Sequence, residues 1–146
     1  MENRERTPDA LTLVGDGPLV YVDDNEMDLV LLERCFSKSR LVDRYELICL
    51  DRVSALMELL DEVERGTRPC PSGVLLDINM PVQTGFDAVR LVRARPRFAD
   101  VPILMMLTNS DSKSDIDQAF ELGADGYQNK PMRMDDLVTF LDGLLP

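Results

Sequence analysis

The chain has 146 residues, of which 27 are acidic and 16 are Lys or Arg, so its formal net charge is -11. This length suits one domain with one apolar core. The acidic balance argues against non-specific binding to nucleic acid or to an anionic membrane, because both favour a basic surface. The chain has no histidine, which excludes Ser-His and Cys-His catalysis, histidine-ligated zinc or iron, and a phosphohistidine carrier.

The N-terminus and the cysteines indicate a cytoplasmic protein. Residues 1–17 are polar and contain proline and glycine, so we expect a flexible N-terminal arm followed by one domain over residues 18–146. No apolar run approaches the ~20 residues of a membrane span, and the pattern of a signal peptide is lacking. Three scattered cysteines without C-x-x-C spacing indicate a reduced protein without disulfides.

The first half of the chain predicts two strand–helix units. Residues 19–22 are apolar and end at two acids, which is typical of a short buried strand. Asn25 can cap a helix over 26–37. A second apolar run predicts a strand over 45–50, and apolar residues at helical spacing predict a helix over 53–63.

The second half of the chain repeats this alternation three times. The predicted strands and helices are, in chain order, 74–76, 86–94, 102–107, 112–122, 126–128 and 134–145. The loop after the third strand contains Pro81 and Gly85, which favour turns. Five strand–helix repeats predict an α/β fold in which a parallel sheet is covered by helices on both faces.

Polar side chains follow four of the predicted strands. Asp23 and Asp24 follow the first, Asp77 the third, Thr108 the fourth and Lys130 the fifth. The carboxyl ends of parallel strands share one edge of the sheet, where ligands bind in open α/β folds. Taken alone, each of these residues is most simply explained as a polar residue that is exposed to solvent at the end of a strand. Three carboxylates that meet, however, repel one another and favour a cation between them.

The predicted cation is Mg²⁺, because carboxylate oxygens without His or Cys ligands suit a hard divalent ion. Such an ion keeps coordination positions open for water or phosphate. An aspartate beside Mg²⁺ and the ammonium of Lys130 is a nucleophile toward phosphorus, and Thr108 can hydrogen-bond an oxygen of the transferring group. The residues thus predict the reversible formation of an aspartyl phosphate.

Several segments together resemble the receiver domain of two-component response regulators. They are VYVDDN at 20–25, LLDINMP at 75–81 with Gly85, LTNS at 107–110, and GADGY at 123–127 followed by Lys130-Pro131. The resemblance covers roughly residues 18–145. It implies a flavodoxin-like receiver fold, with a five-stranded, doubly wound parallel sheet in the order 2-1-3-4-5.

The resemblance also implies a phosphoacceptor and a metal site. Asp77 would accept the phosphoryl group. Asp24 would bind Mg²⁺ directly, Asp23 directly or through water, and Asp77 and the backbone carbonyl of Asn79 would complete the site.

A switch is implied at the same edge of the sheet. Thr108 would be the hydroxyl that moves toward the phosphoryl group, and Tyr127 the aromatic residue that turns inward with it, although a half-buried tyrosine is also consistent with ordinary packing. Lys130 would pair with the phosphoryl oxygens, and Pro131 would hold the lysine loop through a cis bond.

The expected function is that of a single-domain response regulator, a signalling module rather than an enzyme, whose only chemistry is self-catalysed phosphotransfer and dephosphorylation. Its partner would be a sensor histidine kinase or a histidine phosphotransfer protein. The connection 94–102 and the run 108–111 are similar to those of stand-alone receivers paired with phytochrome-type kinases. Phosphorylation would switch a surface that docks a partner or a second copy of the chain.

The last predicted helix carries a wide apolar stripe. Its core face comprises Met134, Leu137, Val138, Leu141 and Leu145. Phe140 and Leu144 widen this face beyond what a sheet normally covers. They form either part of a docking patch, for a homodimer or another partner, or two tolerated exposed apolar residues.

Two other classes of protein remain as alternatives. A phosphatase of the haloacid-dehalogenase type also uses an aspartate nucleophile and Mg²⁺, but it needs a second acid two residues later, where this chain has Asn79. A phosphorylation-independent adaptor on the same fold is the other. The complete acid set argues against it, and Mg²⁺ binding separates it from a working receiver.

Overall fold

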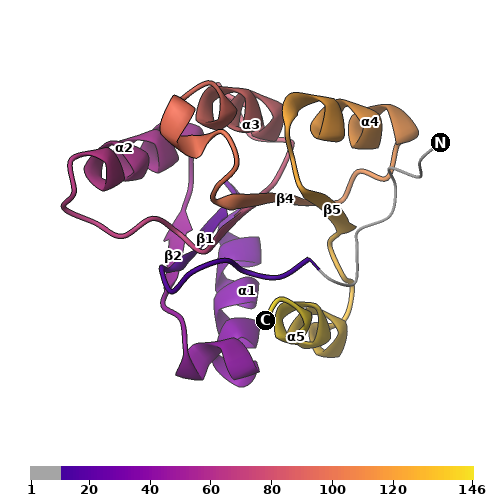
Figure 1. Cartoon of the computed structure of the whole chain (residues 1–146). Helices are drawn as coiled ribbons and strands as arrows, with labels where there is room; N and C mark the ends of the chain where they lie inside the picture. Colours follow the sequence, from indigo (N-terminus) through magenta and orange to yellow (C-terminus); the bar gives the residue numbers. More distant parts are fainter. Residues whose placement is uncertain (1–10) are drawn as a thin grey trace.

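The computed structural model describes residues 11–146 as a five-stranded parallel sheet between two layers of helices (Figure 1). The strands are β1 (Leu19–Val22), β2 (Leu47–Leu50), β3 (Gly73–Leu76), β4 (Ile103–Thr108) and β5 (Gly126–Asn129). Their order in the sheet is β2-β1-β3-β4-β5. The predicted fold class and strand order are confirmed.

Five α-helices alternate with the strands, as the sequence predicts. They are α1 (Glu26–Lys38), α2 (Val53–Glu64), α3 (Gly85–Arg93), α4 (Lys113–Leu122) and α5 (Met134–Gly143). Two short 3-10 helices, η1 (Arg40–Asp43) and η2 (Pro96–Phe98), were not expected. No helix within residues 11–146 is both long and apolar enough to cross a membrane.

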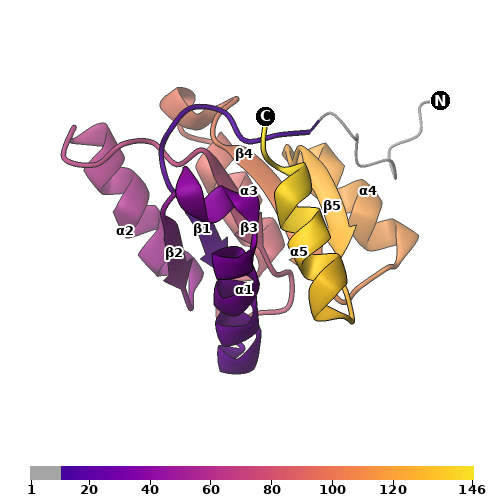
Figure 2. The same cartoon turned by 90° about the horizontal axis from the view of Figure 1, so that it is seen from below.

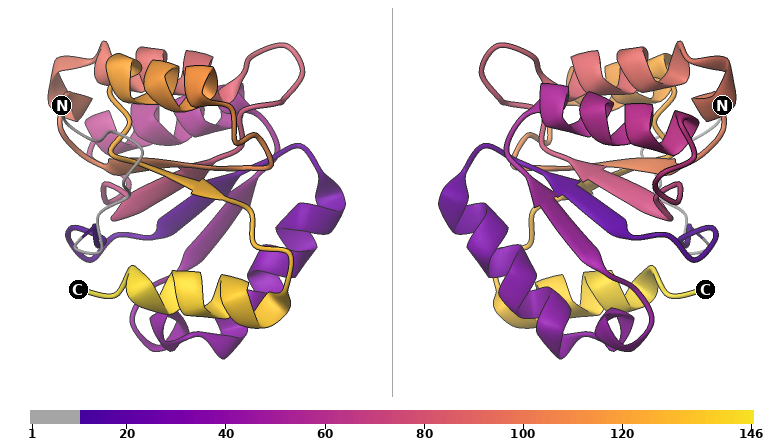
Figure 3. Two further views of the ribbon diagram at one scale, coloured as in Figure 1. Left: turned by 90° about the vertical axis from the view of Figure 1, so that its right-hand side faces the viewer. Right: turned by 90° about the vertical axis from the view of Figure 1, so that its left-hand side faces the viewer.

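The helices divide between the two faces of the sheet. Helices α1 and α5 lie side by side on one face, and α2, α3 and α4 cover the other (Figures 1, 2 and 3). Because successive strand residues point to opposite faces, the β1 side chains divide between two cores. Val20 and Val22 pack toward α2, whereas Leu19 and Tyr21 pack toward α1 and α5.

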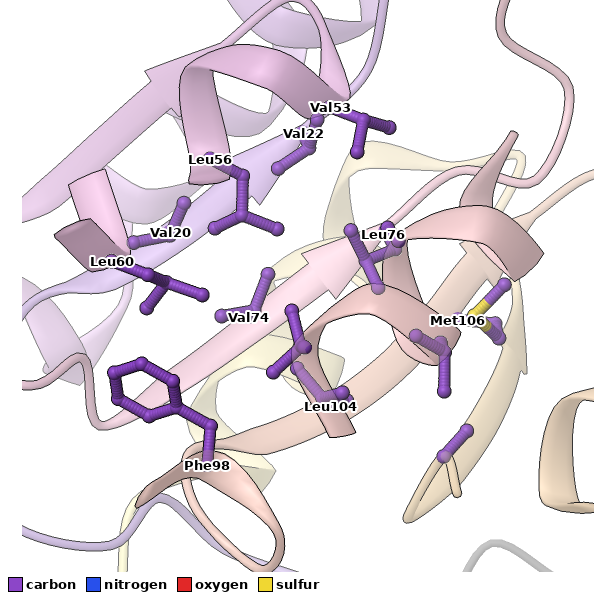
Figure 4. Packing of buried hydrophobic residues seen from close by; sticks show 14 of the residues in the cluster. Val20, Val22, Val53, Leu56, Leu60, Val74, Leu76, Phe98, Leu104 and Met106 are labelled. Carbon is purple, nitrogen blue, oxygen red and sulfur yellow. The ribbon is translucent and has the colours of Figure 1, made fainter. Parts of the chain in front are cut away.

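The core under α2 and α3 fixes the strands that carry the site. Figure 4 shows side chains of β1, β3 and β4 pointing toward those of α2 and toward Phe98. In this cluster Val20, Leu76 and Leu104 are completely buried. Strands buried on both faces read as continuous apolar runs, which is why the sequence locates these strands within one to two residues.

Residues 11–17 differ from the flexible arm expected for residues 1–17. The backbone N–H of Leu13 donates to the carbonyl of Leu144 at 2.9 Å, and that of Val14 donates to the carbonyl of Ser72 at 3.1 Å. The Leu13 side chain is buried. These residues therefore belong to the folded domain. The part of the expected arm before residue 11 lies outside the described residues.

The same contact corrects the surface expected on the last helix. Leu144 is 3% exposed because Leu13 and the apolar core cover it. Phe140 is only partly buried and packs on the edge of that core. The apolar patch predicted from Phe140 and Leu144 is thus reduced to Phe140.

The expected cis bond between Lys130 and Pro131 is also wrong. Within residues 11–146 the cis peptide bond lies at Val101–Pro102. The backbone N–H of Lys130 donates to the carbonyl of Thr108 at 2.8 Å. This bond extends the β4–β5 pairing by one residue, and the Lys130–Pro131 bond that follows is trans.

Candidate functional site

The candidate site is a cleft at the carboxyl edge of the sheet. It has a volume of about 530 Å³ and is lined, among others, by Asp24, Asp28, Asp77, Asn79 and Lys130. The loops after β1, β3 and β5 supply these residues, together with the first turn of α1. This is the position at which open α/β sheets bind their ligands.

The register of β1 and β3 brings Asp23 beside Asp77. Val22 pairs with Leu76 in the parallel sheet, so the residues that follow the two strands are neighbours. The N–H of Asp23 donates to the carbonyl of Leu50, and that of Asp77 to the carbonyl of Val22, each at 3.0 Å. These bonds continue the ladder by one residue and fix the direction of both side chains.

Three of the predicted residues form a compact acidic cluster. One carboxylate oxygen each from Asp23, Asp24 and Asp77 lies within 4.8 Å of the other two. Asp23 is fully buried, Asp77 is 7% exposed, and Asp24 is exposed to solvent. Buried carboxylates at this spacing repel one another, so the cluster favours a bound cation.

The hydrogen bonds of Asp23 restrict how it can contact a metal ion. Its Oδ2 accepts from the hydroxyl of Tyr21 at 2.5 Å and lies 2.8 Å from Nζ of Lys130. Its Oδ1 accepts from the backbone N–H of Asn25 at 2.9 Å. Each carboxylate oxygen offers about two acceptor sites. A single site on Oδ1 therefore remains for a metal ion or its water, whereas the exposed Asp24 can offer a whole carboxylate.

Lys130 provides the positive charge beside the acids. Its Nζ lies 2.7 Å from Oδ2 of Asp28 and 3.7 Å from Oδ1 of Asp77. Burial disfavours the charged ammonium, but hydrogen bonds to Asp23 and Asp28 outweigh this effect, so the pKa of Lys130 is raised. Lys130 is thus a permanent cation at the entrance to Asp77.

The environment of Asp77 holds it as a poorly solvated carboxylate. Burial raises the pKa of Asp77, and the negative charge of Asp23 raises it further, while Lys130 and a hydrogen bond from Thr108 oppose the shift. A carboxylate that has lost part of its hydration and is not hydrogen-bonded by an ammonium is available to attack an electrophile.

Gly85 permits the close packing behind Asp77. A Cβ atom on this residue would lie 2.4 Å from the carbonyl oxygen of Asp77 and 2.8 Å from the side chain of Met106. The carbonyl oxygen of Asp77 cannot move away from such a Cβ atom without shifting Asp77 itself. Helix α3 begins at this glycine, after a capping box formed by Thr84 and Asp87.

Thr108 and Tyr127 are linked through the loop after β4. Thr108 is fully buried at the end of β4, and its Oγ1 lies 3.4 Å from the backbone N–H of Ser110. The hydroxyl of Tyr127 donates to the carbonyl of Ser110 at 2.8 Å, and its side chain is buried. A movement of Thr108 would therefore reach Tyr127 through one residue.

The donor set of the cleft fits Mg²⁺. The oxygens of Asp23, Asp24 and Asp77 are hard ligands, and the chain has no histidine that would favour a softer metal. Asn79 lies on the rim of the same cleft. The five residues predicted from strand ends therefore meet at this edge of the sheet, with Asn79 beside them and Tyr127 one loop away.

Two residues of this site were missed by sequence reasoning. Tyr21 precedes Asp23 by two positions, and since strand side chains alternate, their common face could have been recognised. Asp28 lies 102 positions from Lys130 in the chain, and no local pattern predicts their contact.

Known proteins are similar to this chain over most of its length. A family described as "Response regulator receiver domain" matches residues 19–142. The response regulator Rcp1 of Synechocystis sp. is 25% identical over 126 residues, which cover 86% of this chain and 84% of Rcp1. The transcriptional regulatory protein GltR of Pseudomonas aeruginosa is 30% identical over 127 residues, which cover 87% of this chain but 48% of GltR.

Solved structures show the same fold. The Mn(2+)-bound form of Rcp1 is 26% identical with a TM-score of 0.73, and the match covers 88% of this chain and 91% of that one. RPA3017, a response regulator in red light signaling of R. palustris, is 27% identical with a TM-score of 0.75, and the match covers 87% of this chain and 90% of that one.

Proposed function

Because the chain belongs to the response regulator receiver family, we propose that Asp77 accepts a phosphoryl group from a phosphohistidine of a partner protein. The donor is a sensor histidine kinase or a histidine phosphotransfer protein. The working unit is the receiver domain together with the residues 11–17 that pack on it, acting in the cytoplasm. The observation that carries this proposal is the position of Asp77, buried between Lys130 and the acids that follow β1.

In the proposed reaction a carboxylate oxygen of Asp77 attacks phosphorus. The new P–O bond forms as the P–N bond to the donor imidazole breaks, and the electron pair of that bond returns to the nitrogen. Lys130 stabilises the oxygens of the transferring group, and Thr108 can hydrogen-bond one of them. Mg²⁺ would be held by Asp23, Asp24, Asp77 and the carbonyl of Asn79, and it would neutralise charge on the phosphoryl oxygens.

The output of the proposed reaction is a change of surface. The phosphoryl group draws the hydroxyl of Thr108 toward it, and the Ser110 carbonyl passes this movement to Tyr127. The surface around the β4–α4 loop thus has two states, which phosphorylation biases. Because the apolar patch on α5 is reduced to the partly buried Phe140, we expect the switched surface to dock a partner protein and not a second copy of the chain through α5.

A phytochrome-type sensor kinase is the proposed partner. RPA3017, at 27% identity, is described as a response regulator in red light signaling. The match covers 87% of this chain and 90% of that one. A phosphotransfer profile of this chain against purified kinases tests the partner, with preferential labelling by a phytochrome-type kinase as the expected result.

Labelling by a small phosphodonor tests the proposed acceptor. Radiolabelled acetyl phosphate with Mg²⁺ should label the wild-type chain, and hydroxylamine should release the label. Asp77→Ala should abolish the labelling, as should removal of Mg²⁺ with EDTA. Asp51→Ala, which removes an exposed acid from the loop after β2, should label fully. Full labelling of Asp77→Ala would overturn the proposal.

Lys130→Ala separates phosphorylation from switching. This variant keeps the nucleophile, so it should still be labelled, while the resonances of Thr108 and Tyr127 should fail to shift upon labelling. A phosphorylation-independent adaptor, by contrast, should show neither label nor dependence on Mg²⁺ in the wild type.

A further inference from the structure

The closest partner of Lys130 is a residue outside the predicted acid set. Its Nζ lies 2.7 Å from Oδ2 of Asp28 and 2.8 Å from Oδ2 of Asp23. The nearest oxygen of Asp77 is 3.7 Å away, which is beyond the length of a hydrogen bond. In the unphosphorylated protein the ammonium is therefore held toward α1 and away from the acceptor.

Asp28 is free to hold this ammonium because it does not cap its own helix. It stands at the third position of α1, where an acid normally accepts the N–H of the capping residue. In α3, Asp87 does this for Thr84 at 2.9 Å. In α1 the N–H of Asn25 is bound by Asp23 instead. The Asp28 carboxylate, 30% exposed, is thereby left for Lys130.

Packing does not fix the position of the ammonium. Lys130 borders the open cleft on one side and a cavity of about 30 Å³ on the other, which Tyr21 and Asp28 also line. Electrostatic partners therefore decide where Nζ lies. The ammonium can pass from Asp28 to an oxygen on Asp77 by a movement of the lysine side chain alone.

We propose that Asp28 is a positioning residue, which holds Lys130 in the resting protein and releases it to the phosphoryl group. This inference rests on the proposed function of Asp77. The carboxylate of Asp28 and the more highly charged phosphoryl group compete for one ammonium. Asp28 thus stabilises the resting state and weakens the hold of the protein on the phosphoryl group. Without its charge, Lys130 moves to Asp77 before phosphorylation.

The first test measures the position of Lys130 by NMR in the metal-free protein. Scalar coupling across hydrogen bonds, from ¹⁵Nζ of Lys130 to carboxylate ¹³Cγ nuclei, identifies its partners. The wild type should show coupling to Asp23 and Asp28. Asp28→Asn should show coupling to Asp77 in place of Asp28. Coupling to Asp77 and none to Asp28 in the wild type would overturn the inference.

The second test measures the affinity for beryllofluoride, a mimic of the phosphoryl group, with Mg²⁺ present and the ¹⁹F resonance of the bound fluoride as the signal, which does not depend on the switch. Asp28→Asn should tighten binding roughly fivefold, which is the effect of about 1 kcal/mol for a partly exposed ion pair. Glu33→Gln is the matched control: it removes the same charge from an exposed position of the same helix, outside the lining of the cleft. It should change affinity by less than about twofold.

A double variant separates positioning from a general effect of charge. In a Lys130→Ala background, Asp28→Asn should no longer improve binding, because its effect passes through the lysine. The same fivefold gain in that background, or an equal gain in Glu33→Gln, would overturn the inference. If the wild type bound no beryllofluoride and Asp77 were never labelled, the proposed function would fail, while the NMR coupling would still decide the position of Lys130.

Discussion

The hydroxyl of Tyr21 donates a 2.5 Å hydrogen bond to Oδ2 of Asp23, beneath the acidic cluster. Tyr21 is 1% exposed, and Asp23 is fully buried. Burial, together with the hydrogen bond to this carboxylate, raises the pKa of the Tyr21 phenol, so the group stays a donor throughout the physiological range. A buried carboxylate is costly unless its acceptor sites are filled, and Tyr21 fills one of them from inside the sheet.

Tyr21→Phe should therefore destabilise the protein by about 2 kcal/mol, the cost of removing a hydrogen bond to a buried charged group. Urea unfolding at pH 7 without Mg²⁺ measures this. Tyr45→Phe is a matched control, because the Tyr45 hydroxyl is buried without a hydrogen-bond partner in residues 11–146. That variant should leave the stability unchanged or slightly increased. Equal losses of stability in the two variants would show that the Tyr21 hydrogen bond does not stabilise the fold.

Asp77→Asn should stabilise the metal-free protein. Burial, followed by the charge of Asp23, raises the pKa of Asp77 in the folded state. The stability linked to this group is therefore fully present below the ordinary pKa of an aspartate and is lost as pH rises through the raised pKa of the folded protein. At pH 7 the ionised carboxylate opposes folding, and the neutral amide removes that cost.

Urea unfolding across this pH range checks the prediction. The difference between Asp77→Asn and the wild type should grow as pH rises through the raised pKa, and Mg²⁺ should reduce it, since the ion stabilises the wild type by binding the folded state. Asp51→Asn, at an exposed site, should show no such difference. An Asp77→Asn variant less stable than the wild type at pH 7 without metal would contradict the predicted gain in stability.

Val82 adopts a strained conformation in the loop after Asp77. Its φ angle is 69°, and the N–H of Gln83 donates to the carbonyl of Pro81 at 2.7 Å around it. A three-residue turn with positive φ is rare, above all for a β-branched residue. The side chain is fully exposed, so no packing compensates for the strain.

Val82→Gly should therefore stabilise the protein by about 1 kcal/mol, because glycine adopts this backbone without strain. Val42→Gly is the comparison, since Val42 is also exposed and its φ is not positive. The free energy of unfolding of Val42→Gly should fall by about 0.5–1 kcal/mol, because glycine loses more conformational entropy on folding. Thermal unfolding of both variants should give shifts of opposite sign, and shifts of the same sign would contradict the assigned strain.

Leu13 tests whether the segment before β1 belongs to the domain. Its side chain is 4% exposed and approaches Gly73, where a Cβ would lie 2.6 Å from it. Leu13→Ala should cost about 3 kcal/mol, as for other buried leucines. Val14→Ala, at a neighbouring residue that is 52% exposed, should cost less than about 0.5 kcal/mol. A negligible loss in Leu13→Ala, measured by urea unfolding, would place this segment outside the cooperative fold.

The sequence by itself determined the elements and the edge at which the site lies. Strands buried on both faces appear as short apolar runs, and the acids that end two of them must share an edge once the sheet is parallel. Asp23, Asp24 and Asp77 were predictable for this reason. The cap at Asn25 was equally local, since it accepts from the N–H of Asp28, three residues later.

Only the tertiary structure decided which groups finally touch. The pair of Lys130 and Asp28 depends on how α1 packs beside the β5–α5 loop, and the burial of Leu144 depends on a segment from the other end of the chain. Periodicity records which face of an element is apolar, but not its position relative to another element. Contacts between residues a hundred positions apart follow from that relative position, which the packing of the whole core sets.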